Sequence, residues 1–294
     1  MNVGCRALAV HDPVQQVRIP AWLLYPTRTP DRIERFGMYS LEVASGAEVA
    51  GAALPLVVIS HGTGGTPWAY RGLAAHLARH GFVVAMLEHP GNTRRDDALA
   101  HTVANLENRP RHIRLVIDAA LADPGLGPLI ARERIAIVGH SMGGYTALAV
   151  LGGRAVTLPT QTPEGRPQPV STEADPRVRA AILLAPAIDW FGGEGALAEV
   201  TAPILVRTGA LDPLASASRV RWALRSHPAP GAIDHADVPN AGHFGFMSPF
   251  PPDLTRPEFP PSQDPPGFDR RAYQDVLFAE VTHFLAIALL LTLR

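Results

Sequence analysis

Residues 135–145 read I-A-I-V-G-H-S-M-G-G-Y and contain the pattern G-x-S-x-G centred on Ser141. An apolar run precedes the pattern, and an alanine-rich apolar run, 145–151, follows it. This order predicts a buried strand, a sharp turn and a helix, with the Ser141 hydroxyl raised clear of the sheet. Glycine suits such a turn because a Cβ beside the serine has no room there. The stretch therefore predicts a nucleophilic serine, and the simpler alternative is a glycine-rich turn without chemistry.

The rest of the chain alternates continuous apolar runs with helical patterns. Continuous apolar runs are typical of parallel strands that are buried on both faces. We therefore expect an α/β fold with a mostly parallel central sheet and helices on both faces, and we interpret residues 1–294 as a single domain. Besides the strand before Ser141 and the helix after it, the expected strands are 17–25, 54–60, 82–87, 178–185, 204–208 and 236–239, and the expected helices are 71–80, 111–122, 216–225 and 271–293.

Two segments interrupt this alternation. Residues 157–176 are rich in Pro, Thr, Gln and Glu, and residues 248–268 are dominated by proline. Both are predicted to be loops or lid-like insertions near the site. Disordered surface padding is an equal alternative for the first, whereas Phe250, Phe259 and Phe268 predict packing for the second.

Composition excludes several kinds of chemistry. All 26 basic residues are arginine, so Schiff-base, pyridoxal-phosphate and Walker A chemistry, which need lysine, are excluded. The formal net charge is −1, with no basic face or tail that indicates nucleic acid. Cys5 is the only cysteine, which rules out an intrachain disulfide and a multi-cysteine metal site. No His, Cys or carboxylate cluster has metal-ligand spacing, so we expect neither a metal nor a cofactor.

The two ends of the chain bear on location and assembly. The first twenty residues contain no apolar core of a signal peptide, which favours a cytoplasmic protein. The apolar run 284–293 is about half as long as a membrane span, so no membrane segment is expected. We expect it to be a helix packed on the core or on a second subunit. Leucines 289–291 would expose an apolar patch on a monomer unless they pack on the sheet or on a partner, and we expect a homodimer.

A serine nucleophile needs a base, an acid that orients the base, and donors for an oxyanion. His243 lies in the loop after the last expected strand, where a base is expected, and His235, which should precede that strand, is the nearest rival. Asp212 follows the strand 204–208 in a turn at the carboxyl edge of the sheet. Asp189, one strand earlier, remains the alternative acid, and either aspartate could be a plain turn residue.

The loop 61–65, H-G-T-G-G, follows an early buried strand and is the second element expected beside Ser141. We expect the backbone N–H groups of Thr63 and Met142 to face the serine as oxyanion donors. Large apolar side chains in loops at the same edge are candidates for an apolar substrate pocket, although such residues are as often plain packing. They are Trp68, Tyr70, Trp190, Phe244 and Met247.

Together these motifs resemble the α/β-hydrolase superfamily, and within it the bacterial proteins called predicted dienelactone hydrolases, which are related to platelet-activating-factor acetylhydrolases. The resemblance covers nearly the whole chain and includes 54–65, 89–92, 139–145, 240–244 and 264–270. The turn at Ser141 is also similar, more distantly, to the serine turn of cutinase-like polyester hydrolases. Ser141 stands where true dienelactone hydrolases have cysteine, so their substrate is not carried over. The eukaryotic acetylhydrolases take their acid nearer Asp189, which keeps that alternative open.

The resemblance implies a metal-independent serine esterase that uses Ser141, Asp212 and His243 on a short-chain, aromatic or polymeric ester. Thioesterases, cofactor-free haloperoxidases and C–C hydrolases share the fold and remain alternative activities. A non-catalytic binding protein is a further alternative, against which the full set of catalytic residues argues.

Overall fold

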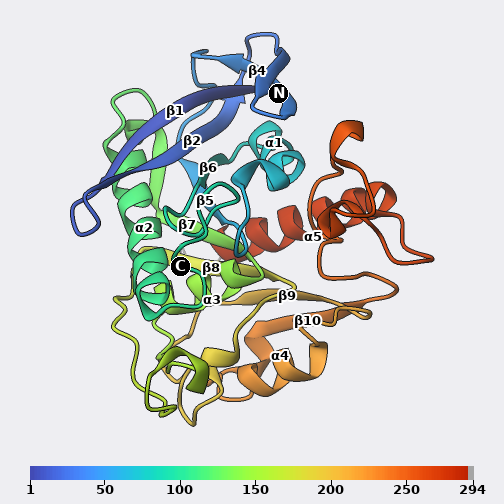
Figure 1. Cartoon of the computed structure of the whole chain (residues 1–294). Coiled ribbons are helices and arrows are strands. Elements are labelled where there is room, and N and C mark those ends of the chain that lie inside the picture. Colours follow the sequence, from blue (N-terminus) through green and yellow to red (C-terminus); the bar gives the residue numbers. More distant parts are fainter. Residues whose placement is uncertain (291–294) are drawn as a thin grey trace.

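The computed structural model describes residues 1–290. Ten strands form one sheet in the order β10-β9-β8-β7-β5-β6-β2-β1-β4-β3 (Figure 1). The strands from β10 to β6 in this order are parallel, as the continuous apolar runs predict. Their bounds are β5 (Leu54–Ser60), β6 (Val83–Leu87), β7 (Ile130–His140), β8 (Val178–Leu184), β9 (Ile204–Gly209) and β10 (Ile233–Val238).

The N-terminal strands extend this sheet beyond the expected elements. They are β1 (Asn2–Asp12), β2 (Val17–Thr27), β3 (Arg32–Phe36) and β4 (Tyr39–Ser45). Strand β2 runs antiparallel to β6 and to β1. Only β2 was expected, because β1 alternates between buried and exposed positions and β3 contains no buried residue. Partly exposed strands lack the continuous apolar run that revealed the others.

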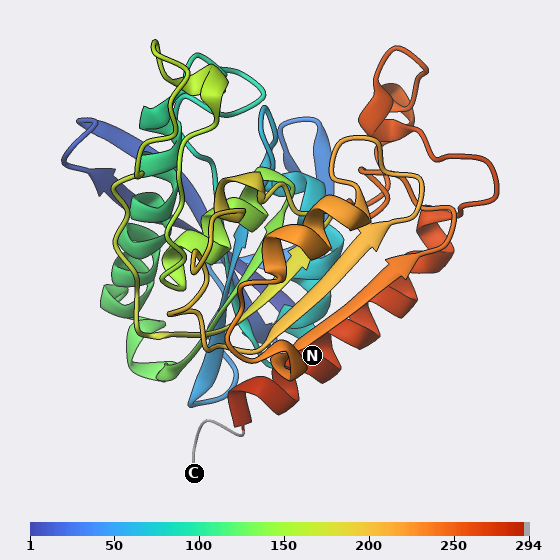
Figure 2. The ribbon, with the colours of Figure 1, turned by 90° about the horizontal axis from the view of Figure 1, so that it is seen from below.

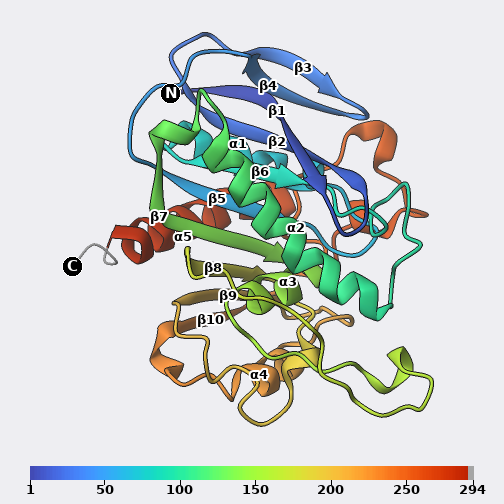
Figure 3. The ribbon, with the colours of Figure 1, turned by 90° about the vertical axis from the view of Figure 1, so that its left-hand side faces the viewer.

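Helices cover both faces of the sheet. Helices α1 (Arg71–Arg79) and α5 (Arg270–Leu290) pack on one face, and α2 (Val103–Ala122), α3 (Met142–Val150) and α4 (Ala217–Leu224) pack on the other. Figure 2 shows α5 and α2 on opposite sides of the strands, and Figure 3 looks onto the face covered by α2 and α3.

Helix α2 begins at Val103, earlier than the expected start at Arg111. Pro110 lies inside the helix, and proline normally ends or kinks a helix. The turn before the proline is buried, with Leu106 and Arg109 both fully inaccessible, so tertiary packing outweighs the local cost.

The order of the strands creates a topological switch point at the carboxyl edge of the sheet. Strand β5 lies between β6 and β7, and the chain leaves β5 toward α1 on one face but leaves β7 toward α3 on the other. The loops after β5 and β7 therefore diverge, and ligand sites of open α/β sheets lie at such a switch point.

The C-terminal helix packs back on the sheet. Leu277, Val281 and Leu285 of α5 are fully buried in the core, while Val276 and Ile287 are exposed. The expected helix beyond residue 290 lies outside the described residues, and the homodimer remains a prediction. Within residues 1–290, no helix is both long enough and apolar enough to cross a membrane.

The two proline-rich segments are largely irregular. The first contains the short 3-10 turn Pro159–Gln161, and the second contains Pro252–Leu254 and Pro260–Ser262. In the second, Phe250 is buried and its ring lies 5.2 Å from that of Phe259. This segment is therefore packed against the body of the protein, as its aromatic residues predict.

We expect the Asp12 carboxylate to be a main anchor between the β1–β2 turn and α2. It accepts hydrogen bonds from the N–H of Val14 at 2.8 Å and from Arg111 Nη2 at 2.8 Å, and His112 Nε2 lies 3.3 Å away. Replacing Asp12 with Ala removes a buried carboxylate that accepts several of the hydrogen bonds between the turn and α2, so the free energy of unfolding should fall by about 2–4 kcal/mol in urea denaturation at pH 7.

The pH dependence of this effect supplies a control. Burial opposes the charge of Asp12, but hydrogen bonds from His112 and Arg111 hold its pKa well below the usual range. The stabilisation is then present above about pH 4 and is lost as the pH falls further. Below about pH 4, the difference in the free energy of unfolding between Asp12→Ala and the parent should therefore become smaller. Asp118→Ala, which removes an exposed pair with Arg177, should cost less than about 1 kcal/mol. If both substitutions lower the free energy of unfolding by the same amount, Asp12 is not a main anchor of the β1–β2 turn.

Candidate active site

Ser141 occupies the tight turn between β7 and α3. Its φ of 53° and ψ of −118° are unusual for a residue other than glycine. Its N–H donates to the carbonyl of Leu184 at 3.0 Å, and its carbonyl accepts from the N–H of Ala187 at 2.9 Å. Contacts with the chain after β8 thus hold the strained turn, and Ser141 itself is half-buried.

The glycines around Ser141 allow three backbone segments to touch. A Cβ on Gly143 would lie 2.0 Å from the carbonyl oxygen of Ser60, and a Cβ on Gly139 would lie 2.1 Å from the carbonyl oxygen of Gly143. No side chain fits either position. The start of α3 is thereby pressed against the end of β5, which brings the next loop to Ser141. A Cβ on Gly62 would lie only 3.0 Å from the Cβ of Ser141.

Two residues with expected donor N–H groups, Met142 and Thr63, directly follow residues of this contact. Met142 is the first residue of α3, so its N–H has no partner within the helix. Thr63 is exposed and directly follows Gly62, the residue that lies against Ser141. Both residues therefore lie where the sequence predicts donors beside the serine.

His243 and Asp212, from separate loops, form a buried hydrogen-bonded pair. Nδ1 of His243 lies 2.7 Å from Oδ2 of Asp212, and each residue is 6% exposed. The other carboxylate oxygen accepts the N–H groups of Leu214 at 2.7 Å and Ala215 at 2.9 Å. Burial opposes the charge of Asp212, but the His243 hydrogen bond and these N–H donors lower its pKa. The second nitrogen of His243, Nε2, is thus the one left to face a reacting group.

His140 connects this pair to the serine turn. Its Nε2 lies 2.8 Å from the carbonyl oxygen of His243, and the two rings lie 5.0 Å apart. Burial, together with the charge of His243, lowers the pKa of His140 to about 3. A neutral imidazole must carry its proton on Nε2 to donate to that carbonyl. The residue next to Ser141 therefore positions the backbone of His243.

The rival residues are engaged elsewhere. Asp189 pairs with Arg219, Oδ2 to Nη2 at 2.7 Å. The expectation that His235 precedes its strand is wrong, because β10 begins at Ile233 and includes it. Its Nε2 lies 3.0 Å from the hydroxyl of Thr208 on the neighbouring strand.

The five expected pocket residues lie in different surroundings. Tyr70 and Met247 are 1% and 7% exposed and pack in the core, so their expected place in a substrate pocket stays a prediction. The ring of Phe244 lies against His243, and Trp190 is half-buried against Tyr145. Trp68 is buried but lines a cavity, which is described below.

Arg109, on α2, is a fully buried cation that sequence reasoning missed. Its Nε donates to the hydroxyl of Thr146 at 2.9 Å, Nη1 donates to Oδ1 of Asn92 at 2.6 Å, and Nη2 donates to the hydroxyl of Ser60 at 3.2 Å and to the carbonyl of His61. Burial lowers its pKa to about 9, so it stays charged at neutral pH.

These acceptors belong to different parts of the site. They lie at the end of β5, in the loop after β6 and on α3, so one guanidinium ties the loop beside Ser141 to the serine helix. The sequence carried a signal for this role. Arg109 falls on the apolar stripe of α2 with Leu106, Ile113 and Val116, where an arginine needs an internal partner.

The described residues offer no cluster of three or more His, Cys, Asp or Glu side chains that could hold a metal ion. The buried histidines near Arg109 instead bind one another and hydroxyl groups. His89 Nε2 lies 2.9 Å from the hydroxyl of Ser60, and His89 Nδ1 lies 3.1 Å from Nδ1 of His112.

The strand order, the two-sided helix layers and the serine turn define an α/β-hydrolase fold. Comparison with known proteins agrees. Residues 51–164 match the family model Hydrolase_4, described as serine aminopeptidase, S33. Platelet-activating factor acetylhydrolase of Cavia porcellus is 27% identical over 146 residues, which cover 34% of this chain and 32% of that protein. The chain thus spans about a third of the length of this relative.

Solved structures match over much more of the chain. A ferulic acid esterase from Streptomyces cinnamoneus has a TM-score of 0.68 at 22% identity, and the match covers 98% of this chain and 89% of the esterase chain. Esterase 2 of Thermogutta terrifontis has a TM-score of 0.57 at 17% identity, with coverage of 95% and 94%. Dienelactone hydrolase from Anabaena variabilis has a TM-score of 0.51 at 18% identity, with coverage of 81% and 88%. The α/β-hydrolase fold expected from the motifs is confirmed.

Replacing Arg109 with Met should destabilise the protein and loosen the loop 61–66. The substitution leaves buried acceptors without a donor, so the free energy of unfolding should fall by about 3 kcal/mol or more. Urea denaturation measures this loss, and hydrogen exchange of the loop amides should accelerate with it.

Arg114→Met is the matched control on the same helix. Arg114 pairs with the exposed Glu173, so its loss should change stability by less than about 1 kcal/mol. If Arg109→Met unfolds no more easily than Arg114→Met, the guanidinium does not hold the site together.

Proposed function

We propose that this protein is a serine carboxylic-ester hydrolase that acts through Ser141, His243 and Asp212. The observation that carries the proposal is the buried hydrogen bond of 2.7 Å between Asp212 and His243, linked through His140 to the strained turn that presents Ser141. A carboxylate on Nδ1 holds the imidazole in the tautomer that a general base requires. The hydrolase and esterase relatives support the same class of reaction.

The reaction begins when the Ser141 hydroxyl attacks the ester carbonyl. Nε2 of His243 takes the hydroxyl proton, and the negative charge moves to the carbonyl oxygen, where the N–H groups of Thr63 and Met142 donate to it. Each such donor contributes about 3 kcal/mol to the transition state in comparable sites. Collapse of the intermediate breaks the bond to the alcohol, which leaves with the proton from His243.

Water completes the cycle. His243 takes a proton from a water molecule that attacks the acyl-enzyme, and Ser141 regains this proton as the carboxylic acid is released. The ferulic acid and platelet-activating factor activities named for the relatives support a small-molecule ester as substrate. We propose short-chain or aromatic esters.

Ser141→Ala should abolish turnover of p-nitrophenyl butyrate without unfolding the protein. Removal of a triad serine costs about four to six orders of magnitude in kcat, because the residues of the triad act as a unit. Initial rates and a thermal melt measure the two effects. A fluorophosphonate should label the parent and not the variant, and a variant that keeps more than about a tenth of the parent rate would falsify the role of Ser141.

Separate substitutions of Asp212 and Asp189 should show which aspartate orients His243. In Asp212→Asn the remaining oxygen can still accept the Leu214 and Ala215 N–H groups, but the amide stabilises the wrong imidazole tautomer. We expect kcat to fall by about 10⁴ near neutral pH. Asp189→Asn only weakens a surface pair with Arg219 and should change kcat by less than about tenfold. The reverse ranking would move the acid to Asp189.

A further inference from the structure

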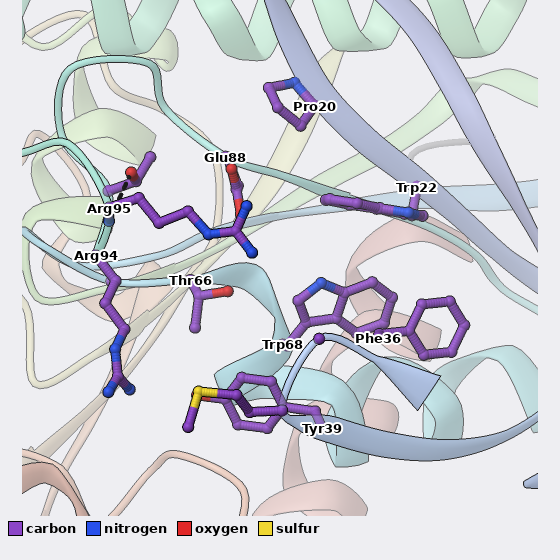
Figure 4. A pocket seen from close by; sticks show the side chains of 13 residues that line it. Pro20, Trp22, Phe36, Tyr39, Thr66, Trp68, Glu88, Arg94 and Arg95 are labelled. Atoms are coloured by element: carbon purple, nitrogen blue, oxygen red, sulfur yellow. Dashed lines mark hydrogen bonds between the residues drawn. The ribbon is translucent and has the colours of Figure 1, made fainter. Parts of the chain in front are cut away.

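The loop that touches Ser141 at Gly62 also lines a separate cavity. Gly65 and Thr66, at the other end of this loop, form part of the wall of a cavity of about 500 Å³ (Figure 4). The volume is within the usual range for small-molecule sites. Ser141, His243 and Asp212 do not line it. The cavity therefore lies beside the proposed reaction centre, one short loop away.

Aromatic rings from three elements form one side of the cavity. Phe36 stacks on Trp68 with ring centroids 4.2 Å apart, and Trp22 meets Trp68 edge-on at 5.0 Å. Trp22 and Phe36 are only half-buried, so part of their apolar surface faces the cavity. Exposed, concave aromatic surface of this kind binds planar rings.

The other side carries positive charge. Arg94 and Arg95 follow β6 and lie across the cavity from the tryptophans (Figure 4). The guanidinium of Arg95 lies next to Glu88. Burial raises the pKa of Glu88, and the positive charge of Arg95 acts in the opposite direction. Arg94 instead lies over the ring of Phe259 at 4.8 Å. Within residues 1–290 no carboxylate forms an ion pair with Arg94, so its charge is available to a ligand.

A buried hydroxyl near Arg94 has no hydrogen-bond partner. Tyr39 is 5% exposed, it lines the cavity, and its phenolic oxygen is unpaired within the described residues. Burial raises the pKa of Tyr39, although the guanidinium groups of Arg94 and Arg71 oppose this shift. The phenol therefore stays protonated and can donate. A buried phenol beside a guanidinium that has no carboxylate partner among the described residues is suited to an anion.

We propose that this cavity is a substrate subsite for an aromatic ring that carries a carboxylate. The ring would lie against Trp22, Trp68 and Phe36, and the carboxylate would accept hydrogen bonds from Tyr39 and Arg94. The proposal rests on the proposed ester hydrolysis, because the carboxylate would be the remote end of an aromatic ester that reaches Ser141. Half-esters of benzenedicarboxylic acids are substrates of this class.

Binding of benzoate to the Ser141→Ala protein tests the subsite without requiring catalysis. Benzamide has nearly the same shape without the charge, and Trp22 and Trp68 report occupancy by fluorescence. Benzoate should bind about five- to tenfold more tightly than benzamide, since a charged hydrogen bond at a partly exposed arginine is worth this much. Equal affinity for the two ligands would overturn the proposal.

Substitutions locate the charge and the hydroxyl. Arg94→Gln should remove the preference for benzoate, and Tyr39→Phe should reduce it. Arg154→Gln is the control, because Arg154 is exposed and does not line the cavity. If the preference for benzoate remains in Arg94→Gln, the proposed subsite is overturned. The same holds if Arg154→Gln removes the preference as completely as Arg94→Gln does.

Turnover by the unmodified protein gives the second test. The monomethyl ester of terephthalic acid should have a kcat/KM about five- to tenfold above that of methyl 4-carbamoylbenzoate, and Arg94→Gln should equalise the two by raising KM for the charged ester. If the Ser141→Ala protein does not bind benzoate while the unmodified protein hydrolyses p-nitrophenyl butyrate, the subsite alone is overturned. Benzoate binding without hydrolysis of any ester would instead overturn the proposed function.

Discussion

The close approach of α3 to the end of β5 is the constraint on which the site depends. Two backbones meet there with no room for a side chain, since a Cβ on Gly143 would lie 2.0 Å from the Ser60 carbonyl oxygen. Because β5 and β7 are neighbours in a parallel sheet, this contact brings the loops after both strands to one point. The strain of the Ser141 backbone is maintained by hydrogen bonds with Leu184 at the end of β8 and with Ala187 just after it, so the turn cannot relax on its own.

Buried polar groups then fix the loops around that turn. Arg109 is the centre of this arrangement because one guanidinium reaches β5, the loop after β6 and α3 at once. Its acceptors are all neutral, so its charge is compensated by the number of hydrogen bonds rather than by an ion pair. The neighbouring His61 and His140 are kept neutral by burial, which lowers both pKa values to about 3 and avoids adding positive charge around the buried arginine.

The same edge of the sheet holds two different environments. Around His243 the groups are buried and paired, which suits a reacting centre that excludes water. Around Arg94 the cavity is open, and among residues 1–290 no carboxylate forms an ion pair with this guanidinium. The loop 61–66 borders both. In the proposed subsite, the substrate would lie along this loop, with its carboxylate in the open cavity and its ester beside Ser141.

The sequence by itself determined the parallel core, the serine turn and the positions of His243 and Asp212 after strands, because continuous apolar runs and G-x-S-x-G are local patterns. It did not reveal β1, β3 and β4, whose half-exposed residues carry a weaker signal, and it placed the start of α2 after Pro110. Only the tertiary structure decided that Asp212 rather than Asp189 meets His243, that Tyr70 is core, and that Arg109 ties the loop beside Ser141 to α3. Those outcomes depend on contacts between residues far apart in the chain, and the energy of such contacts does not appear in any local window of sequence.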